Sequence, residues 1–349
     1  MTFPGPVLAA PMAGGAGTPA LLAACGGGFL AAGYLAPGAL ATRIAEARAA
    51  GTWFGVNVFA PPPIPADPGE LHRYLEELRD EFAVYDLTPV LPSAAGDDDH
   101  WAAKLDLLLA DPVPAVSFTF GIPPASTVAA LRRAGTLVLQ TVTSPVEALA
   151  AAEAGVDALV VQAPAAGGHS ATLTPSDPPG ASPLPDLVAA VLAVTPLPIV
   201  AAGGLARSAD VSAALHAGAT ATMVGTALLR TDEAGTSAPH RTALSAAIRM
   251  PAGSSTGDTA GDSGAGHDTV VTRAFTGRPA RALRNGFIDR HDATAPLGYP
   301  QIHHLTGPLR KAAAAAGDTD RVHLWAGTGH RHAATGPAAA VVAALTAAL

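Results

Sequence analysis

The sequence contains little cysteine, little lysine and no long apolar run. Cys25 is the only cysteine among 349 residues, which excludes an internal disulfide, and residues 1–15 carry no Lys or Arg ahead of their modest apolar segment. Both features favour a cytoplasmic protein. Lys104 and Lys311 are the only lysines and the net charge is −8, so no basic stripe exists to attract nucleic acid. Pro, Gly and charged residues interrupt each apolar run short of a membrane span. A small-molecule partner is therefore expected.

Short apolar segments alternate with alanine-rich helical stretches along most of the chain. With 49% hydrophobic residues, the protein can bury a substantial core. Eight βα repeats connected by right-handed crossovers predict an α/β fold, a TIM (β/α)8 barrel, with a doubly wound open sheet as the alternative. The expected strands are 7–10, 29–32, 53–58, 115–119, 136–141, 157–161, 197–201 and 221–224.

Two helix starts carry clear signals, and a third stretch is acidic. Thr18 with Pro19, and Ser144 with Pro145, each have the form of an N-cap followed by proline at the first helical position. The acidic run 97–99 precedes Trp101 and is typical of a helix start that complements the helix dipole. A solvated cap is favoured there over an acidic metal site.

The stretch 156–170 combines a buried strand with a polar, glycine-rich end. Gln162 falls where the strand should end, Gly167 and Gly168 allow the backbone to approach a ligand, and His169 is the one titratable side chain after the strand. This pattern predicts the edge of an active site. A glycine-rich turn with a surface histidine is the alternative.

Two further glycine loops follow the last two expected strands. The loops are 201–206 (AAGGLA) and 223–226 (MVGT), and in a barrel both lie at the carboxyl ends of the strands. Gly203, Gly204 and Gly225 leave backbone amides unobstructed, which predicts a phosphate site; a glycine turn needed only for packing is the alternative. No GxGxxG fingerprint follows a strand, so a dinucleotide fold is not supported.

The pattern changes after residue 229. Residues 1–230 are expected to form the barrel, with a proline-rich insertion at 61–68. Residues 231–325 are expected to form a smaller helical cap with a mobile loop at 251–268, and 326–349 a helix that returns to the barrel. No histidine spacing matches a zinc motif, so no metal is expected, and solvated side chains are predicted for His303, His304, His330 and His332.

Several motifs give the chain a family resemblance that runs nearly end to end. They are APMAGG from Ala10, GVNVF from Gly55, VVQAPAAGGH from Val160, AAGGLA from Ala201 and MVGT from Met223. Further on come FTGRPARALRN, YP and LWAGTG. Together these resemble the nitronate monooxygenases, formerly called 2-nitropropane dioxygenases, and in particular their class I branch.

The resemblance implies a TIM barrel with non-covalently bound FMN and an appended helical domain. His169 is the implied catalytic histidine, which either takes the α-proton of a nitroalkane or stabilises the bound anion when protonated. The implied reaction passes electrons from an anionic nitronate to the flavin and then to O2, giving a carbonyl compound and nitrite. The implied flavin contacts are Asn57, Gln162, Gly167, Gly204, Met223, Val224, Gly225 and Thr226.

One departure from the family pattern follows the histidine. Ser170 and Ala171 stand where the family usually has Arg-Gly, which bears on substrate identity more than on flavin binding. Three alternatives stay open from sequence. The first is an FMN-dependent enoyl-thioester reductase that uses NAD(P)H, the second a flavin oxidase acting on another stabilised carbanion, and the third a flavin-binding carrier or sensor without catalysis.

Overall fold

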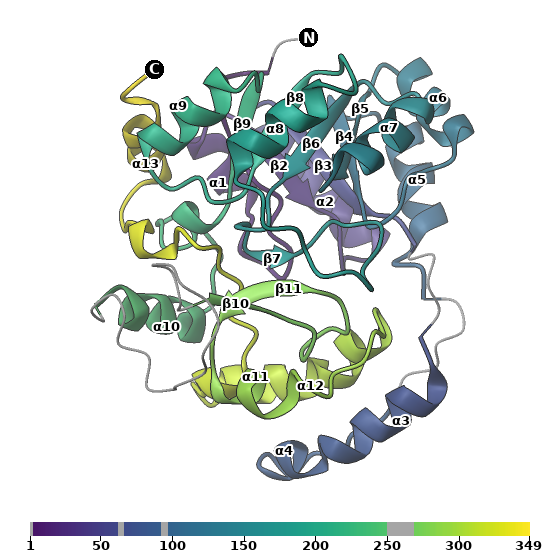
Figure 1. Ribbon diagram of the computed structural model, residues 1–349, viewed down its shortest axis with the longest axis vertical. Coiled ribbons are helices and arrows are strands. Elements are labelled where there is room, and N and C mark those ends of the chain that lie inside the picture. Colours follow the sequence, from purple (N-terminus) through teal and green to yellow (C-terminus); the bar gives the residue numbers. More distant parts are fainter. Residues whose placement is uncertain (1–2, 62–65, 92–96, 250–268) are drawn as a thin grey trace.

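Eight parallel strands close into a barrel (Figure 1). The structure is a computed structural model that describes residues 3–61, 66–91, 97–249 and 269–349. β9 pairs with β1 through Val7 and Thr222, which closes the ring and excludes the open sheet. The predicted TIM barrel and all eight strands are confirmed. The strands are β1 Val7–Ala9, β2 Gly28–Ala31, β3 Phe54–Phe59, β4 Ala115–Thr119, β5 Leu137–Val142, β6 Ala158–Gln162, β8 Ile199–Ala202 and β9 Ala221–Val224.

Helices surround the barrel, and both predicted helix starts are confirmed. The Thr18 hydroxyl accepts a hydrogen bond from Leu21 N at 3.0 Å, and the Ser144 hydroxyl accepts one from Glu147 N at 3.2 Å. The last helix, α13, packs against α9 and α1, so the end of the chain lies on the barrel. The outer helices are α1 Pro19–Ala24, α2 Pro37–Ala49, α5 Trp101–Ala110, α6 Ala125–Arg133, α7 Pro145–Glu153, α8 Leu184–Leu192, α9 Ser208–His216 and α13 Ala338–Thr346.

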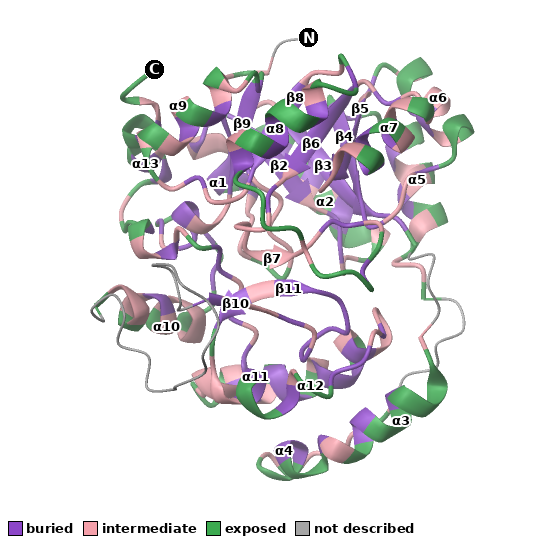
Figure 2. Ribbon diagram, viewed as in Figure 1, coloured by how far each residue is buried: buried purple, intermediate pink, exposed green. Residues whose placement is uncertain are grey.

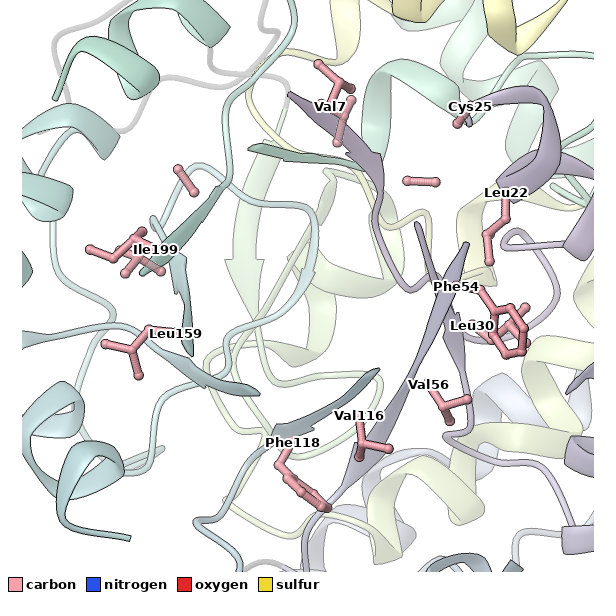
Figure 3. Packing of buried hydrophobic residues seen from close by; sticks show 14 of the residues in the cluster. Val7, Leu22, Cys25, Leu30, Phe54, Val56, Val116, Phe118, Leu159 and Ile199 are labelled. Carbon is pink, nitrogen blue, oxygen red and sulfur yellow. The ribbon is translucent and has the colours of Figure 1, made fainter. Parts of the chain in front are cut away.

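Alternate side chains of each strand enter two different cores, as the two-residue period of a strand requires. Side chains such as Val56, Leu159 and Ile199 pack outward against the helices (Figure 3). Leu8 and Phe29 belong to the cluster inside the barrel. A Cβ atom at Gly55 would lie 2.3 Å from the Phe29 ring, so glycine is required beside that ring. The barrel strands are largely buried and lie in the upper half of Figure 2, inside the ring of helices.

A cap of sheet and helices covers one end of the barrel (Figure 1). Its antiparallel sheet has the order β10, β11, β7, and β7 comes from the loop that follows β6 of the barrel. This short strand therefore ties His169 to both parts of the molecule. The cap strands are β7 Gly168–His169, β10 Thr269–Thr272 and β11 Ala280–Leu283, and its helices are α3 Pro68–Glu77, α4 Arg79–Ala83, α10 Ala238–Arg249, α11 Gly286–His291 and α12 Gln301–Ala315.

The division of the chain into barrel and cap differs in two ways from the expected division at residue 230. Leu71, Tyr74 and Phe82 of α3 and α4 share a core with Phe275 and Phe287, so residues 68–83 pack on the cap although they precede residue 230. The cap also contains a sheet and is not purely helical. The apolar stripe of α3 shows that one face is buried but does not identify the surface that buries it.

Two expected segments lie wholly or partly outside the described residues. They are the loop 251–268 and, within the proline-rich insertion 61–68, residues 62–65. Within the described ranges, no helix has both the length and the apolar character needed to cross a membrane.

Candidate active site

A cavity of about 540 Å³ lies at the carboxyl ends of the barrel strands, beneath the cap. This is the end of a TIM barrel at which active sites are found. The structure places every residue of the sequence-predicted site on its wall, although these residues come from four different strand ends. The predicted residues are His169, Asn57, Gln162, Gly167, Gly204, Met223, Val224, Gly225 and Thr226.

Glycines allow the loops of this wall to pack backbone against backbone. Gly203 and Gly204 have φ angles of +103° and +77°, a region that favours glycine. A Cβ atom at Gly203 would lie 2.8 Å from the Ala163 carbonyl oxygen, and one at Gly167 would lie 2.5 Å from Gly327 N. The result is a wall of exposed backbone with little side chain, which is the form of a phosphate or cofactor cradle.

The C-terminal segment completes this wall and was not assigned to the site from sequence. Gly327 and Gly329 line the cavity, and Gly327 N donates a hydrogen bond to the Thr226 hydroxyl at 3.0 Å. The motif LWAGTG contains both glycines, so the signal was present in the sequence. What the sequence lacked was evidence that a segment so far along the chain returns to the strand ends.

Asn57 and Gln162 hold fixed positions at the barrel end of the cavity. Asn57 is 3% exposed, and its Nδ2 donates to the hydroxyls of Ser117 and Thr119, each at 2.9 Å. Gln162 Nε2 donates to the His169 carbonyl at 3.2 Å, and Gln162 Oε1 accepts from Ala171 N at 2.8 Å. Gln162 therefore braces the turn that carries the histidine from both sides.

The His169 side chain is surrounded by aromatic residues and makes a polar contact with Thr276. Its ring centroid lies 5.6, 5.7 and 5.4 Å from those of Phe120, Tyr299 and Trp325. Nε2 lies 3.0 Å from the Thr276 hydroxyl, which itself donates to the Arg278 carbonyl at 3.3 Å. Because the hydroxyl proton is used there, Nε2 is the nitrogen that carries hydrogen. Nδ1 then keeps its lone pair.

Burial and two nearby guanidinium groups keep His169 neutral. Burial first, and then Arg278 and Arg310, lower its pKa from the usual 6.5 to about 3. Arg278 is 1% exposed, donates to the carbonyls of Ser170 and Thr172, and lies 4.0 Å from the centre of the Phe120 ring.

Arg310 is likewise buried and bonded only to neutral groups. It donates to the Thr306 hydroxyl at 3.1 Å and to the His303 carbonyl at 2.7 Å, and it lines the cavity. Within the described ranges, neither Arg278 nor Arg310 forms a salt bridge with a carboxylate. Buried cations are normally paired with anions, so the positive potential of these two arginines favours the binding of an anion in the cavity.

The prediction that four C-terminal histidines have solvated side chains was wrong for two of them. His304 and His332 are exposed, as expected, but His330 is fully buried and His303 lies in the cavity. The His303 ring stacks on Tyr34 with centroids 4.0 Å apart. His303, Gly307, Arg310 and Ala314 recur at helical spacing on the cavity face of α12, and this period could have revealed them from sequence.

The acidic run 97–99 is not simply a solvated cap. The N-cap position of α5 is His100, and the Asp98 carboxylate accepts a hydrogen bond from Trp101 N at 3.3 Å at the start of this helix. Asp99 instead pairs with the fully buried Lys104 at 2.7 Å and accepts from Tyr34 N at 3.0 Å. Tyr34 has a left-handed φ of +68°, so this contact holds a strained residue that lines the cavity. In the described part of the chain, no group of three or more His, Cys, Asp or Glu could hold a metal.

The fold and the site define a TIM-barrel enzyme with a capped cavity at its strand ends. The nitronate monooxygenase family model matches residues 2–250 and 258–348, and the chain belongs to that family. It is accordingly an oxidoreductase of the monooxygenase type.

Relatives with assigned names agree with this membership. A probable nitronate monooxygenase from Bacillus subtilis is 31% identical over 333 residues, covering 93% of this chain and 90% of the relative. One from Staphylococcus aureus is 32% identical over 347 residues, covering 97% and 92%.

Two similar structures bear on the fold. The structure of a nitroalkane oxidase from Streptomyces ansochromogenes is 45% identical, with a TM-score of 0.88 and coverage of 99% of this chain and 96% of that chain. FabK from Thermotoga maritima is 23% identical with a TM-score of 0.71, covering 98% and 91%, and shows the shared fold alone.

Proposed function

We propose that the protein binds FMN in the capped cavity and oxidises alkyl nitronates with O2 to a carbonyl compound and nitrite. Family membership and the 45% identity to a nitroalkane oxidase support flavin-dependent oxidation of a nitro compound. The observation that carries the narrower proposal is the neutral His169 beside two buried arginines that have no salt-bridged carboxylate in the described ranges. Such a site attracts a small anion.

The residues on the cavity wall fit a flavin mononucleotide. Gly204, Gly225 and Thr226 would hold the phosphate, since the first two offer backbone without side chains and the third adds a hydroxyl. Asn57 and Gln162 would contact the ring with their amides. A bound flavin would supply the two-electron acceptor that the substrate carbon requires and would pass those electrons to oxygen.

The charges of the site favour a preformed anion over a neutral nitroalkane. Arg310, which lines the cavity, would stabilise the negative charge shared by the nitronate oxygens and carbon, and the charge of Arg278, which packs on the Phe120 ring, would add to the positive potential. His169 Nδ1 is available to take the α-proton of a neutral nitroalkane, but a base with a pKa of about 3 is weak for that task at neutral pH. Nitronates should therefore react faster than nitroalkanes.

The aromatic residues around His169 restrict water near the reacting carbon. Phe120, Tyr299 and Trp325 surround the imidazole from three directions. Exclusion of water strengthens the attraction between the two guanidinium groups and the bound anion. It also limits reprotonation of the nitronate carbon before oxidation.

Product analysis tests the proposal. Purified protein given 2-propyl nitronate in air should consume oxygen and release acetone and nitrite, and denaturation should release FMN. The His169→Asn variant should keep its flavin, because the flavin contacts proposed here come from other residues. Protein that contains FMN but forms no nitrite above the uncatalysed rate would refute the proposed reaction.

A further inference from the structure

One part of the cavity wall is polar and is not used by the proposed chemistry. Thr236 precedes α10 and His240 lies in its first turns, one helical turn apart, and both line the cavity. Thr236 is 8% exposed, so its hydroxyl is almost completely removed from solvent. Neither the Thr236 hydroxyl nor His240 Nε2 has a hydrogen-bond partner among the described residues.

The His240 ring is neutral and has an unpartnered nitrogen. Burial lowers the pKa of His240 to about 4, so the ring carries no charge at pH 7. Nε2 is buried without a hydrogen-bond partner among the described residues. In the tautomer with its hydrogen on Nδ1, a neutral imidazole presents a lone pair at Nε2. The wall therefore offers one acceptor at His240 and one hydroxyl at Thr236.

Leaving these atoms unpaired is costly, since a buried polar group without a partner has lost its hydration and gained no hydrogen bond in exchange. The neighbouring cavity wall is apolar, with Met12, Leu229 and Val322 sharing one cluster. Such a surface suits an aliphatic chain that ends in a group able both to donate and to accept a hydrogen bond. A hydroxyl meets this description, donating to His240 Nε2 and accepting from Thr236.

Trp325 relates this region to the reacting end of the site. Its ring lies 5.4 Å from the His169 ring between centroids, and it lines the same cavity as His240. We propose that Thr236 and His240 form a second subsite, which recognises a terminal hydroxyl on an aliphatic substrate whose anionic end lies at His169. The proposal rests on the proposed function for the position of that anionic end.

Binding of unreactive carboxylates tests the subsite without turnover. A carboxylate is planar and anionic, as a nitronate is, and can take its place beside His169 and Arg310, which line the cavity. Calorimetric titration of the flavin-loaded protein would compare ω-hydroxy carboxylates, from hydroxybutanoate to hydroxyoctanoate, with carboxylates that carry a methyl group in place of the hydroxyl. At the matching length, the hydroxy acid should bind about tenfold more tightly, as expected when two buried polar groups gain partners.

Two variants and one control locate the effect. Thr236→Val keeps the shape of the side chain, and His240→Leu removes the acceptor; each should reduce the hydroxyl preference to about twofold or less. Ser245→Ala is the control, since Ser245 also lies on α10 but bonds the Arg241 carbonyl at 2.8 Å and does not line the cavity. It should keep the full preference.

Three results would overturn the subsite. One is the absence of a hydroxyl preference at every chain length, and another is a preference that survives in both variants. The third is tighter binding of α,ω-dicarboxylates that Lys311→Met abolishes, because the distal group would then be an anion held by the exposed Lys311 on this wall. A hydroxyl preference in protein that forms no nitrite would support the subsite while refuting the reaction, so the two failures are distinguishable.

Discussion

The pH dependence of nitroalkane oxidation offers a quantitative test of the His169 environment. If His169 is the base for a neutral nitroalkane, as proposed, that reaction requires a neutral His169, because only that form can take the α-proton. With the usual pKa of 6.5, roughly 3% of the histidine would be neutral at pH 5. With the lowered pKa of about 3, nearly all of it is neutral at that pH. The two cases differ about thirtyfold in the active fraction at pH 5.

The assay is kcat/KM for nitroethane from initial rates of oxygen uptake between pH 5 and 8. We predict a profile without an acid limb in that range, because the folded pKa lies below it. Preformed ethyl nitronate, mixed from an alkaline stock, is the control for other groups that titrate. A tenfold fall in kcat/KM per pH unit below 6.5 with nitroethane alone would show an ordinary histidine and refute the argument from burial and the two arginines.

Three further predictions follow from the same structure. Gly225→Asp should give folded but colourless protein, because its carboxylate would face the flavin phosphate. The control Gly225→Ala should stay yellow, since a Cβ there meets only ordinary contacts at 3.4 Å or more. Normal flavin absorbance in the Asp variant would contradict the assignment of Gly225 to the phosphate site. Arg310→Met should lower kcat/KM for 2-propyl nitronate about 10- to 100-fold with flavin retained, as expected for one charged hydrogen bond, and an unchanged value would exclude Arg310 from anion binding. Glu81→Gln should destabilise the cap by about 3 kcal/mol in chemical denaturation, because Glu81 is 6% exposed and bonds His291, Arg290 and Arg321. The pKa of this carboxylate is lowered to about 2, so its contribution to stability should be complete above pH 4.5 and should fall as the pH drops toward 2. A difference in stability between wild type and variant that does not diminish at low pH would contradict this prediction.

The sequence was informative wherever a local pattern determines structure. Short β-branched runs and capped helix starts such as Thr18 with Pro19 defined the barrel, because strand and helix periods are read from neighbouring residues. The glycine loops indicated the site because they follow predicted strands, and a barrel brings strand ends together.

Long-range packing limited what the sequence could reveal. The sequence did not indicate that α3 packs on the cap, that Gly327 completes the glycine wall, or that the Asp99 carboxylate accepts a hydrogen bond from Tyr34 N. Each of these contacts joins segments whose separation along the chain leaves no periodic signal. The neutral state of His169 likewise depends first on its burial and then on Arg278 and Arg310, which lie more than a hundred residues away in sequence.

The central claim is that this cavity oxidises nitronates, and anaerobic reduction of the bound flavin tests it most directly. Flavin-loaded protein would be mixed without oxygen in a stopped-flow instrument with 2-propyl nitronate or with NADH or NADPH, and the loss of flavin absorbance followed. We predict rapid bleaching by the nitronate and none on the same timescale by either nicotinamide. Bleaching by NADH or NADPH alone would contradict the account and indicate a reductase, and no bleaching by any of the three would indicate a flavin-binding protein without this catalysis.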